Sequence, residues 1–276
     1  MQLCCPVCQA NLLEDNRQLR CAQGHSFDAA RQGYYNLLLV QRKRSLDPGD
    51  NPEMVQARRQ FLNRGQYEPL SDAINQLCAN ALGDAQTPDI LDVGCGEGYY
   101  TTRLREHLLT TGLAPDIVGL DISKHAIKAA TQRNRDIQWL VASAADMPLP
   151  DQQLDLAVLL FSRILPEPLS RVLKPGGTLL VAWSGRDHLR QLRELIYAEV
   201  HDSVMDVTEL LQTHFTPSEI TTVHYDFTLS GADAIGDLLA MTPHGQRLKS
   251  EARERILNLN SLTLTLDVNL GIFKRL

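Results

Sequence analysis

Between residues 89 and 183 the sequence alternates short apolar runs with amphipathic segments, and this alternation constrains the fold most strongly. The apolar runs have the length of buried strands, whereas the segments between them repeat apolar residues at helical spacing. Parallel strands need crossover connections, which are usually helices. The pattern therefore predicts an α/β fold with a doubly wound, mainly parallel sheet. The expected strands are 89–93, 116–121, 137–141, 154–160 and 178–183.

Helical spacing also marks the segments on either side of this region. In 53–63, apolar residues form one stripe, and Arg58 and Arg59 lie off it. Two late runs alternate apolar and polar residues, which predicts antiparallel strands over 221–229 and 262–272. The expected helices are 53–63, 68–82, 99–109, 123–135, 166–173, 187–201, 231–241 and 245–259.

Three glycines, Gly94, Gly96 and Gly98, follow the first expected strand and open the next helix. Glycine lets the backbone turn tightly and approach a ligand without a Cβ clash. The full dinucleotide fingerprint would need a glycine where Tyr99 stands. The loop therefore indicates a nucleotide-like cofactor of another kind.

Acidic residues end the next two strands. Asp121 closes the second strand, where a carboxylate can bind both hydroxyls of a ribose, and Asp146 follows the third. Together with the glycine loop and the Leu-Lys-Pro-Gly-Gly stretch at 173–177, this ordered set resembles the class I S-adenosylmethionine (SAM)-dependent methyltransferases, which have a Rossmann-like sheet. The structural alternative for any one of these residues is a turn or a helix cap, but it does not explain the series.

Four of the six cysteines lie in the first 21 residues. Cys5 and Cys8 form a C-x₂-C pair, and Cys21 and His25 form a C-x₃-H pair. Each pair suits a tight turn that presents two ligands, so the spacing predicts a closed, structural Cys₃His zinc site in a zinc-ribbon-like module. Cys4 adjoins the first ligand, but Cys5 has the better spacing. The alternative is a set of reduced core cysteines with a surface histidine.

The charge is uneven along the chain. The net charge is −6, yet residues 1–64 carry 9 Lys and Arg against 6 Asp and Glu. Arg42, Lys43 and Arg44 form a consecutive basic run that could contact a polyanion. The start lacks a secretory signal, and no apolar run approaches the roughly 18 residues of a membrane span, so we expect a cytoplasmic protein.

Longer stretches resemble one family of enzymes. Gly-Tyr-Tyr-Asn-Leu-Leu at 33–38, Lys-Arg-Ser-Leu-Asp-Pro-Gly-Asp at 43–50, Gln-Ala-Arg-Arg-Gln-Phe-Leu at 56–62 and Gly-Gln-Tyr-Glu-Pro-Leu at 65–70 accompany the cysteines and the glycine loop. The chain resembles the bacterial 23S ribosomal RNA (guanine-N1)-methyltransferases, the RlmA family. The match covers residues 5 to about 201, and Met241-Thr242-Pro243 with Arg247 beyond.

This resemblance implies SAM as the cofactor, one structural zinc ion, a homodimer, and methylation of guanine N1 in a hairpin of 23S rRNA. It implies SAM contacts from Tyr67, from the Gly96-Glu97-Gly98-Tyr99 turn and from His188. Alternatively, Tyr67 could be plain packing and His188 a surface residue at a helix start.

Two segments depart from the family pattern. After the fourth strand the family has an aromatic-Ala-Pro-Cys stretch, of which only Phe161 is kept, and His244-Gly245-Gln246 replaces bulky aromatics. Both segments are expected near the acceptor. Phe161 could stack on a flat acceptor or belong to the core. No residue is assigned as catalytic.

The expected organisation is a zinc-binding RNA-recognition module over 1–40, a basic linker and helix over 41–60, and a methyltransferase domain over 61–276. Other functions remain open at this point. The enzyme could methylate another RNA nucleotide or a small molecule, or the chain could be a zinc-containing RNA-binding protein with a vestigial SAM fold.

Overall fold

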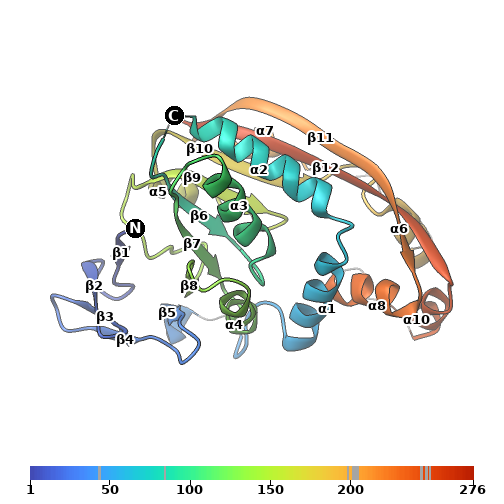
Figure 1. The fold of residues 1–276 in the computed structure, drawn as a ribbon, viewed down its shortest axis with the longest axis horizontal. Coiled ribbons are helices and arrows are strands. Elements are labelled where there is room, and N and C mark those ends of the chain that lie inside the picture. Colours follow the sequence, from blue (N-terminus) through green and yellow to red (C-terminus); the bar gives the residue numbers. More distant parts are fainter. Residues whose placement is uncertain are drawn as a thin grey trace.

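The computed structural model describes residues 1–42, 45–83, 85–197, 199–200, 205–242, 245, 248 and 250–276. Two sheets are present in this part of the chain. A small sheet has the order β1-β2-β3-β4, and an eight-stranded sheet has the order β11-β12-β10-β9-β6-β7-β8-β5. Figure 1 shows the small sheet at one end of the molecule and the long strands β11 and β12 sweeping away from it.

The large sheet is parallel from β5 to β10 and antiparallel at the far edge, where β12 pairs with both β10 and β11. Strand order reverses at β6, from which the chain proceeds to β7 and β8 on one side and returns to β9 on the other. Such a switch point leaves a crevice at the carboxyl ends of the strands. The doubly wound sheet with late antiparallel strands is confirmed. Its strands are β5 (Tyr35–Asn36), β6 (Asp89–Val93), β7 (Asp116–Asp121), β8 (Gln138–Val141), β9 (Leu154–Leu160), β10 (Leu173–Ser184), β11 (Phe215–Ser230) and β12 (Ser261–Arg275).

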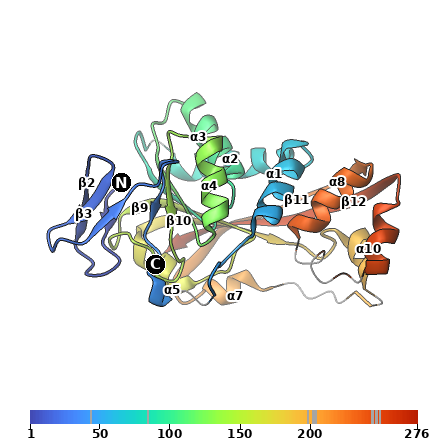
Figure 2. The same cartoon turned by 90° about the horizontal axis from the view of Figure 1, so that it is seen from below.

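Alternate residues of the strands feed two hydrophobic cores, one on each face. Ile90 and Val158 belong to one core, while Leu91 and Leu159 belong to the other. The first core is covered by α1, α2, α3, α4, α6 and α8, and the second by α5, α7 and the small sheet (Figure 2). The helices are α1 (Pro52–Asn63), α2 (Glu68–Leu82), α3 (Tyr99–Thr110), α4 (Lys124–Arg133), α5 (Pro166–Val172), α6 (Arg190–Ile196), α7 (Val207–Leu211), α8 (Ala232–Met241) and α10 (Ser250–Leu257), with a 3₁₀ turn η1 (Val40–Arg42).

The helix expected over 187–201 is wrong at both ends, because α6 covers only Arg190–Ile196 and Tyr197 is already extended. Its first residues are bound to β12: the Asp187 amide donates to the Asp267 carboxylate at 2.8 Å, and the Leu189 amide to the Thr265 carbonyl at 2.8 Å. Leu189 then adopts a left-handed conformation with φ 52°, and the helix begins only at Arg190. Residues 198 and 201 of the expected helix lie outside the described residues, as do 246, 247 and 249 of the one expected over 245–259, of which α10 forms a part.

The small sheet consists of β1 (Leu3–Cys4), β2 (Asn11–Asp15), β3 (Gln18–Cys21) and β4 (Ser26–Asp28), all antiparallel. Its apolar side chains Leu3, Leu12 and Leu19 are buried in the same core as Leu149, which lies between β8 and β9 of the eight-stranded sheet. The chain then contributes β5 to the large sheet, beside β8. The cysteine-rich head thus shares a core with the body, which fits a segment too short to bury a core alone.

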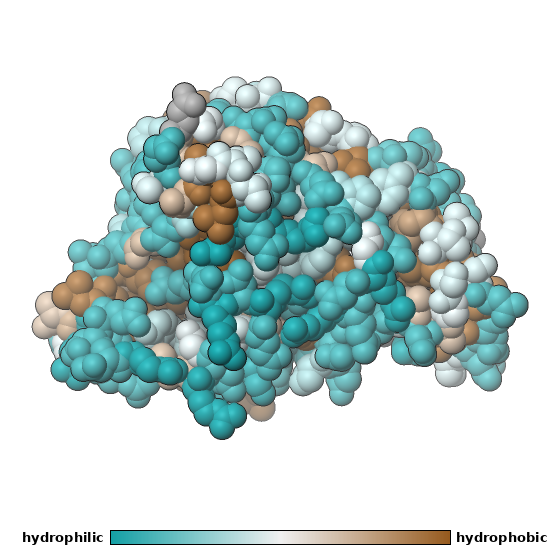
Figure 3. Space-filling view, viewed as in Figure 1, coloured by the Kyte–Doolittle hydropathy of each residue, from teal (hydrophilic) through white to brown (hydrophobic). Residues whose placement is uncertain are grey.

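The face seen in Figure 3 is largely hydrophilic, with apolar side chains in scattered patches. Among the described residues, no helix combines the length and the apolar character that crossing a bilayer requires.

Candidate functional site

The predicted zinc ligands come together in the small sheet. One ligand atom from each of Cys5, Cys8, Cys21 and His25 lies within 4.8 Å of the others. The Sγ atoms of Cys8 and Cys21 are 3.7 Å apart, and Cys21 Sγ is 3.4 Å from His25 Nδ1. A tetrahedral ion with bonds of about 2.3 Å to sulfur requires sulfur atoms about 3.8 Å apart. The four residues therefore fit zinc.

Two tight turns present these ligands. In the first, the Gln9 amide donates to the Cys5 carbonyl at 2.8 Å, and in the second the Gly24 amide donates to the Cys21 carbonyl at 3.0 Å. Cys4 stays outside the cluster, because its backbone amide donates to Pro148 of the large unit and its buried side chain belongs to no ligand group among the described residues. Burial raises the pKa of the Cys21 thiol, but hydrogen bonds from His25 and backbone amides outweigh it and lower that pKa to about 6.

The glycine loop lies at the switch point, between β6 and α3. The amides of Gly94 and Cys95 both donate to the Leu120 carbonyl, at 2.7 and 3.0 Å, which holds the loop against the end of β7. Gly96 and Gly98 have φ of 57° and 81°, conformations that favour glycine. A Cβ at Gly98 would lie 2.7 Å from the Trp139 ring, so this glycine also lets α3 pack closely on the sheet.

Asp121 lies beside this loop, as predicted. One carboxylate oxygen accepts the Gly96 amide at 3.0 Å, and the other accepts the Ser123 amide at 2.7 Å. Burial raises the pKa of Asp121, while the two amides and the charge of Arg58 oppose the shift. Each carboxylate oxygen has a second lone pair. The two oxygens can therefore still accept hydrogen bonds from the two hydroxyls of a ribose.

Glu97 and Tyr99, the other predicted residues of the turn, contact α4. Glu97 is 2% exposed and accepts a hydrogen bond from Arg133 Nε at 2.8 Å. Burial raises the pKa of Glu97, and the charge of Arg133 opposes that shift. The same guanidinium lies 5.4 Å from the ring centre of Tyr99, with Arg103 at 5.6 Å. These contacts fix the shape of the loop and the start of α3.

Tyr67 and His188, far apart in sequence, meet in an aromatic row. Their ring centres are 6.4 Å apart, and Tyr67 is buried against Phe61 and Phe227. On its other side His188 stacks with Phe161 at 6.1 Å and 22° between the planes. Phe161 is 44% exposed, so it does not belong to the core. It has φ 53°, a strained conformation for a bulky residue, and such strain is concentrated at functional sites.

The structure adds Asp267 on β12, for which the sequence carried no signal beyond an alternating strand. Its backbone amide donates to His188 Nδ1 at 3.3 Å, and its side chain accepts the Asp187 amide. A Cβ at Gly185 would lie 2.3 Å from the Asp267 carboxylate, so glycine is needed there. Asp267 thus fixes the segment that carries His188 beside the aromatic row.

The segment before α1 covers the start of α4. His125 Nε2 is 2.9 Å from the Asp47 carboxylate, and Ser123 Oγ donates to the Asp50 carbonyl at 2.6 Å. Asp146 follows β8, where its amide closes a turn on the Ser143 carbonyl at 3.0 Å. Lys43, Arg44 and the side chain of Arg42 lie outside the described part of the chain, as do residues 244 and 246.

A second buried carboxylate lies under the loop. Asp92 on β6 is 2% exposed, and one of its oxygens accepts the Thr101 hydroxyl at 2.6 Å. Its other oxygen has no hydrogen-bond partner among the described residues. Burial raises the pKa of Asp92 to about 7, although the Thr101 bond acts in the opposite direction.

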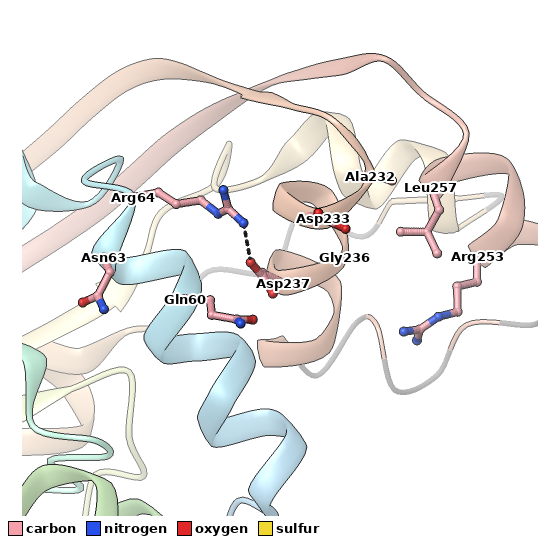
Figure 4. A pocket seen from close by; sticks show the side chains of 9 residues that line it. All are labelled: Gln60, Asn63, Arg64, Ala232, Asp233, Gly236, Asp237, Arg253 and Leu257. Atoms are coloured by element: carbon pink, nitrogen blue, oxygen red, sulfur yellow. Dashed lines mark hydrogen bonds and ion pairs between the residues drawn. The ribbon is translucent and has the colours of Figure 1, made fainter. Parts of the chain in front are cut away.

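An open cleft of about 760 Å³ lies apart from the glycine loop, between α1, α8 and α10 (Figure 4). Arg64 and Arg253 line it together with Asp233 and Asp237, and Arg64 pairs with Asp237 at 2.8 Å. The mixed charges distinguish it from a uniformly basic phosphate groove.

Two family models match the chain. Residues 3–46 match the model described as "RlmA, N-terminal", a zinc ribbon, and residues 90–177 match the model described as "Methyltransferase domain". These matches coincide with the cysteine cluster and with the glycine loop. The chain therefore has a SAM-dependent methyltransferase fold with a zinc-ribbon module, and its cofactors are SAM and one structural zinc ion.

Curated relatives cover most of the chain. A protein of Streptomyces fradiae named 23S rRNA (guanine(748)-N(1))-methyltransferase is 34% identical over 87% of this chain and 84% of its own length. A Bacillus subtilis (strain 168) protein named for 23S rRNA (guanine-N(1)-)-methyltransferase activity is 30% identical over 97% of this chain and 95% of its own. Among solved structures, a SAM-dependent methyltransferase of Aquifex aeolicus superposes with a TM-score of 0.50 at 16% identity, over 82% of this chain and 99% of that one, which supports the fold.

Proposed function

This chain belongs to the family of 23S rRNA (guanine-N1)-methyltransferases, and from this premise we propose that it transfers the methyl group of SAM to N1 of a guanine in a hairpin of 23S rRNA. The single observation that carries the proposal is the exposed, strained Phe161, stacked on His188 at the carboxyl end of β9. A glycine loop alone would fit many acceptors, whereas an exposed aromatic platform fits a flat base.

SAM supplies an electrophilic methyl group on a sulfonium centre. The protein's main contribution is then to hold the acceptor atom close to that methyl and in line with it. We assign cofactor contacts to Tyr67, Gly94, Gly96, Glu97, Gly98, Tyr99, Asp121, Asp146 and His188. Of these, Asp121 binds the ribose hydroxyls, and Glu97 acts mainly by fixing the turn through Arg133.

Phe161 stacks on the target guanine. A base inside a hairpin must be extruded before N1, which lies on the pairing edge, can be reached, and an aromatic ring compensates for the lost stacking. The exposed position of Phe161 beside the glycine loop supports this role, because Ser162, the next residue, lies against Gly94.

The zinc module over 1–40 and the linker over 41–60 bind the RNA, and residues 61–276 form the methyltransferase domain. Residues 41–60 carry 5 Lys and Arg against 3 Asp and Glu, which supports RNA binding by the linker, whereas residues 1–40 carry 3 of each. We also propose that the chain forms a homodimer. We place it in the cytoplasm, as expected for an enzyme that acts on ribosomal RNA.

The experiment uses unmodified 23S rRNA incubated with the purified protein and SAM. A methyl group on guanine N1 blocks the pairing edge, so reverse transcription should stop at one guanine of one hairpin only when SAM is present. Digestion to nucleosides should then give 1-methylguanosine. A methylated product of any other kind would refute the proposed substrate.

A further inference from the structure

Arg58, in the middle of α1, places its guanidinium over the glycine loop. A Cβ built on Gly96 would lie 3.6 Å from Arg58 Nη1. Gly96 also donates its amide to Asp121, so the guanidinium and the ribose-binding carboxylate flank the same glycine. The charge of Arg58 acts on both Asp121 and Glu97. A ligand seated on the loop therefore meets Arg58 directly.

The guanidinium has two contacts that join separate parts of the chain. Nη1 is 2.5 Å from the carboxylate of Asp50 in the segment before α1, and Nη2 donates to the Met241 carbonyl at the end of α8 at 3.2 Å. Both members of the ion pair are partly open to solvent, with side chains 31% and 23% exposed. The site therefore already holds one carboxylate and is accessible to another.

We propose that Arg58 binds the α-carboxylate of the methionyl group of SAM, and that Asp50 occupies the place of this carboxylate when the cofactor is absent. The methionyl group carries the one carboxylate of SAM, and its sulfonium sulfur is bonded to the ribose C5′. With the ribose on Asp121, the carboxylate falls within reach of the guanidinium on the other side of Gly96. Arginine and carboxylate form paired, charge-assisted hydrogen bonds, the strongest class available to this group.

The exchange links the cofactor to the linker. Asp50 belongs to the segment that Ser123 and His125 hold against α4, and this segment joins the zinc module to α1. When the cofactor carboxylate pairs with Arg58, Asp50 loses its ion pair with that guanidinium. The linker then loses one of the contacts that hold it in place. The inference rests on SAM as the cofactor and is independent of the identity of the methylated base.

The test compares two ligands on one variant by calorimetry. S-adenosylhomocysteine carries the carboxylate, and its decarboxylated analogue keeps the adenosine, the thioether and the amine. Arg58→Met should weaken the first about tenfold or more and leave the second within about twofold. Arg64→Met is the matched control, because Arg64 also joins the α1 region to α8, through Asp237 at 2.8 Å, but lies apart from the glycine loop and should affect neither ligand.

Asp50→Asn removes the competing carboxylate and should strengthen S-adenosylhomocysteine binding by about two- to fivefold, the range of a partly exposed ion pair. Arg58→Lys keeps the charge and tests the paired geometry should Arg58→Met fold poorly; it too should weaken only the carboxylate ligand. Equal weakening of both ligands in the Arg58 variants would show that Arg58 merely clamps the linker to α8. Unchanged or weaker binding in Asp50→Asn would overturn the exchange. A lack of rRNA methylation would leave these binding results unaffected.

Discussion

Replacing Phe161 tests whether the aromatic platform binds the target base. Removing an aromatic ring that stacks on a nucleic-acid base costs roughly 1–3 kcal/mol. Because about 1.4 kcal/mol corresponds to a factor of ten, Phe161→Ala should lower kcat/KM for RNA about 5- to 150-fold. Phe161→Trp keeps a stacking surface and should retain most of the activity.

The left-handed backbone at this position adds a second expectation. Phe161 has φ 53°, which costs roughly 1–2 kcal/mol for a residue with a Cβ. Phe161→Gly should therefore be at least as stable to heat as Phe161→Ala, although both lack the ring. A purely structural role would instead make activity follow stability across the series.

The assay is methyl transfer to an RNA hairpin at saturating SAM, with SAM affinity measured separately by calorimetry. We expect SAM affinity to change less than about threefold in Phe161→Ala, because the ring lies beyond His188 from Tyr67. Wild-type kcat/KM for RNA in Phe161→Ala would refute the stacking role. A loss of SAM affinity equal to the loss of activity would refute it as well.

Four further predictions concern the zinc site, the cofactor, a buried acid and the linker. Cys21→Ser should lose the roughly one zinc ion per chain found by elemental analysis, while SAM binding stays largely intact; stoichiometric zinc in this variant would contradict the assignment. Asp121→Ala should weaken SAM about tenfold or more by calorimetry, with zinc content unchanged. The pKa of Asp92 is raised from 3.8 to about 7, so the stability that Asp92 contributes is present below about pH 4 and is lost as the pH rises through 7. Asp92→Asn should therefore raise Tm more at pH 8 than at pH 5. An equal change in Tm at both pH values would contradict the raised pKa. Replacing Arg42, Lys43 and Arg44 together by alanine should weaken RNA binding and leave SAM affinity unaltered. The slope of log affinity against log salt should fall by roughly 0.7–0.9 for each phosphate contact that is lost.

The sequence predicted the strands of the large sheet well because their burial on both faces leaves continuous apolar runs. The expected strands 89–93, 116–121 and 154–160 agree with β6, β7 and β9. The short strand β5 was missed, since two residues carry no period, and it forms only because β8 offers an open edge.

The helix expected over 187–201 shows that tertiary contacts can override a local helical pattern. Its spacing is helical, but β12 binds the backbone amides of Asp187 and Leu189, and Leu189 is held there in a left-handed conformation that an α-helix cannot pass through. The competing partners lie about 80 positions away in the sequence.

The candidate site was partly predictable for the same reason. Cysteine spacing and the glycine loop are local signals, and the structure brings each set together. Arg58 was recognised only as lying off an apolar stripe, because its position over Gly96 depends on how α1 crosses the sheet. The pairing of Phe161 with His188 likewise depends on two strands meeting.

Methylation of guanine N1 by this chain can be measured directly by mass mapping of modified nucleotides in 23S rRNA from cells with and without the gene. We expect one hairpin guanine to carry a methyl group on N1 in the first sample and none in the second, and we expect the chain to restore this methyl group and the Asp121→Ala variant to do so poorly. Identical modification of 23S rRNA in both samples, with a methylated small molecule as the one difference between the cells, would contradict it.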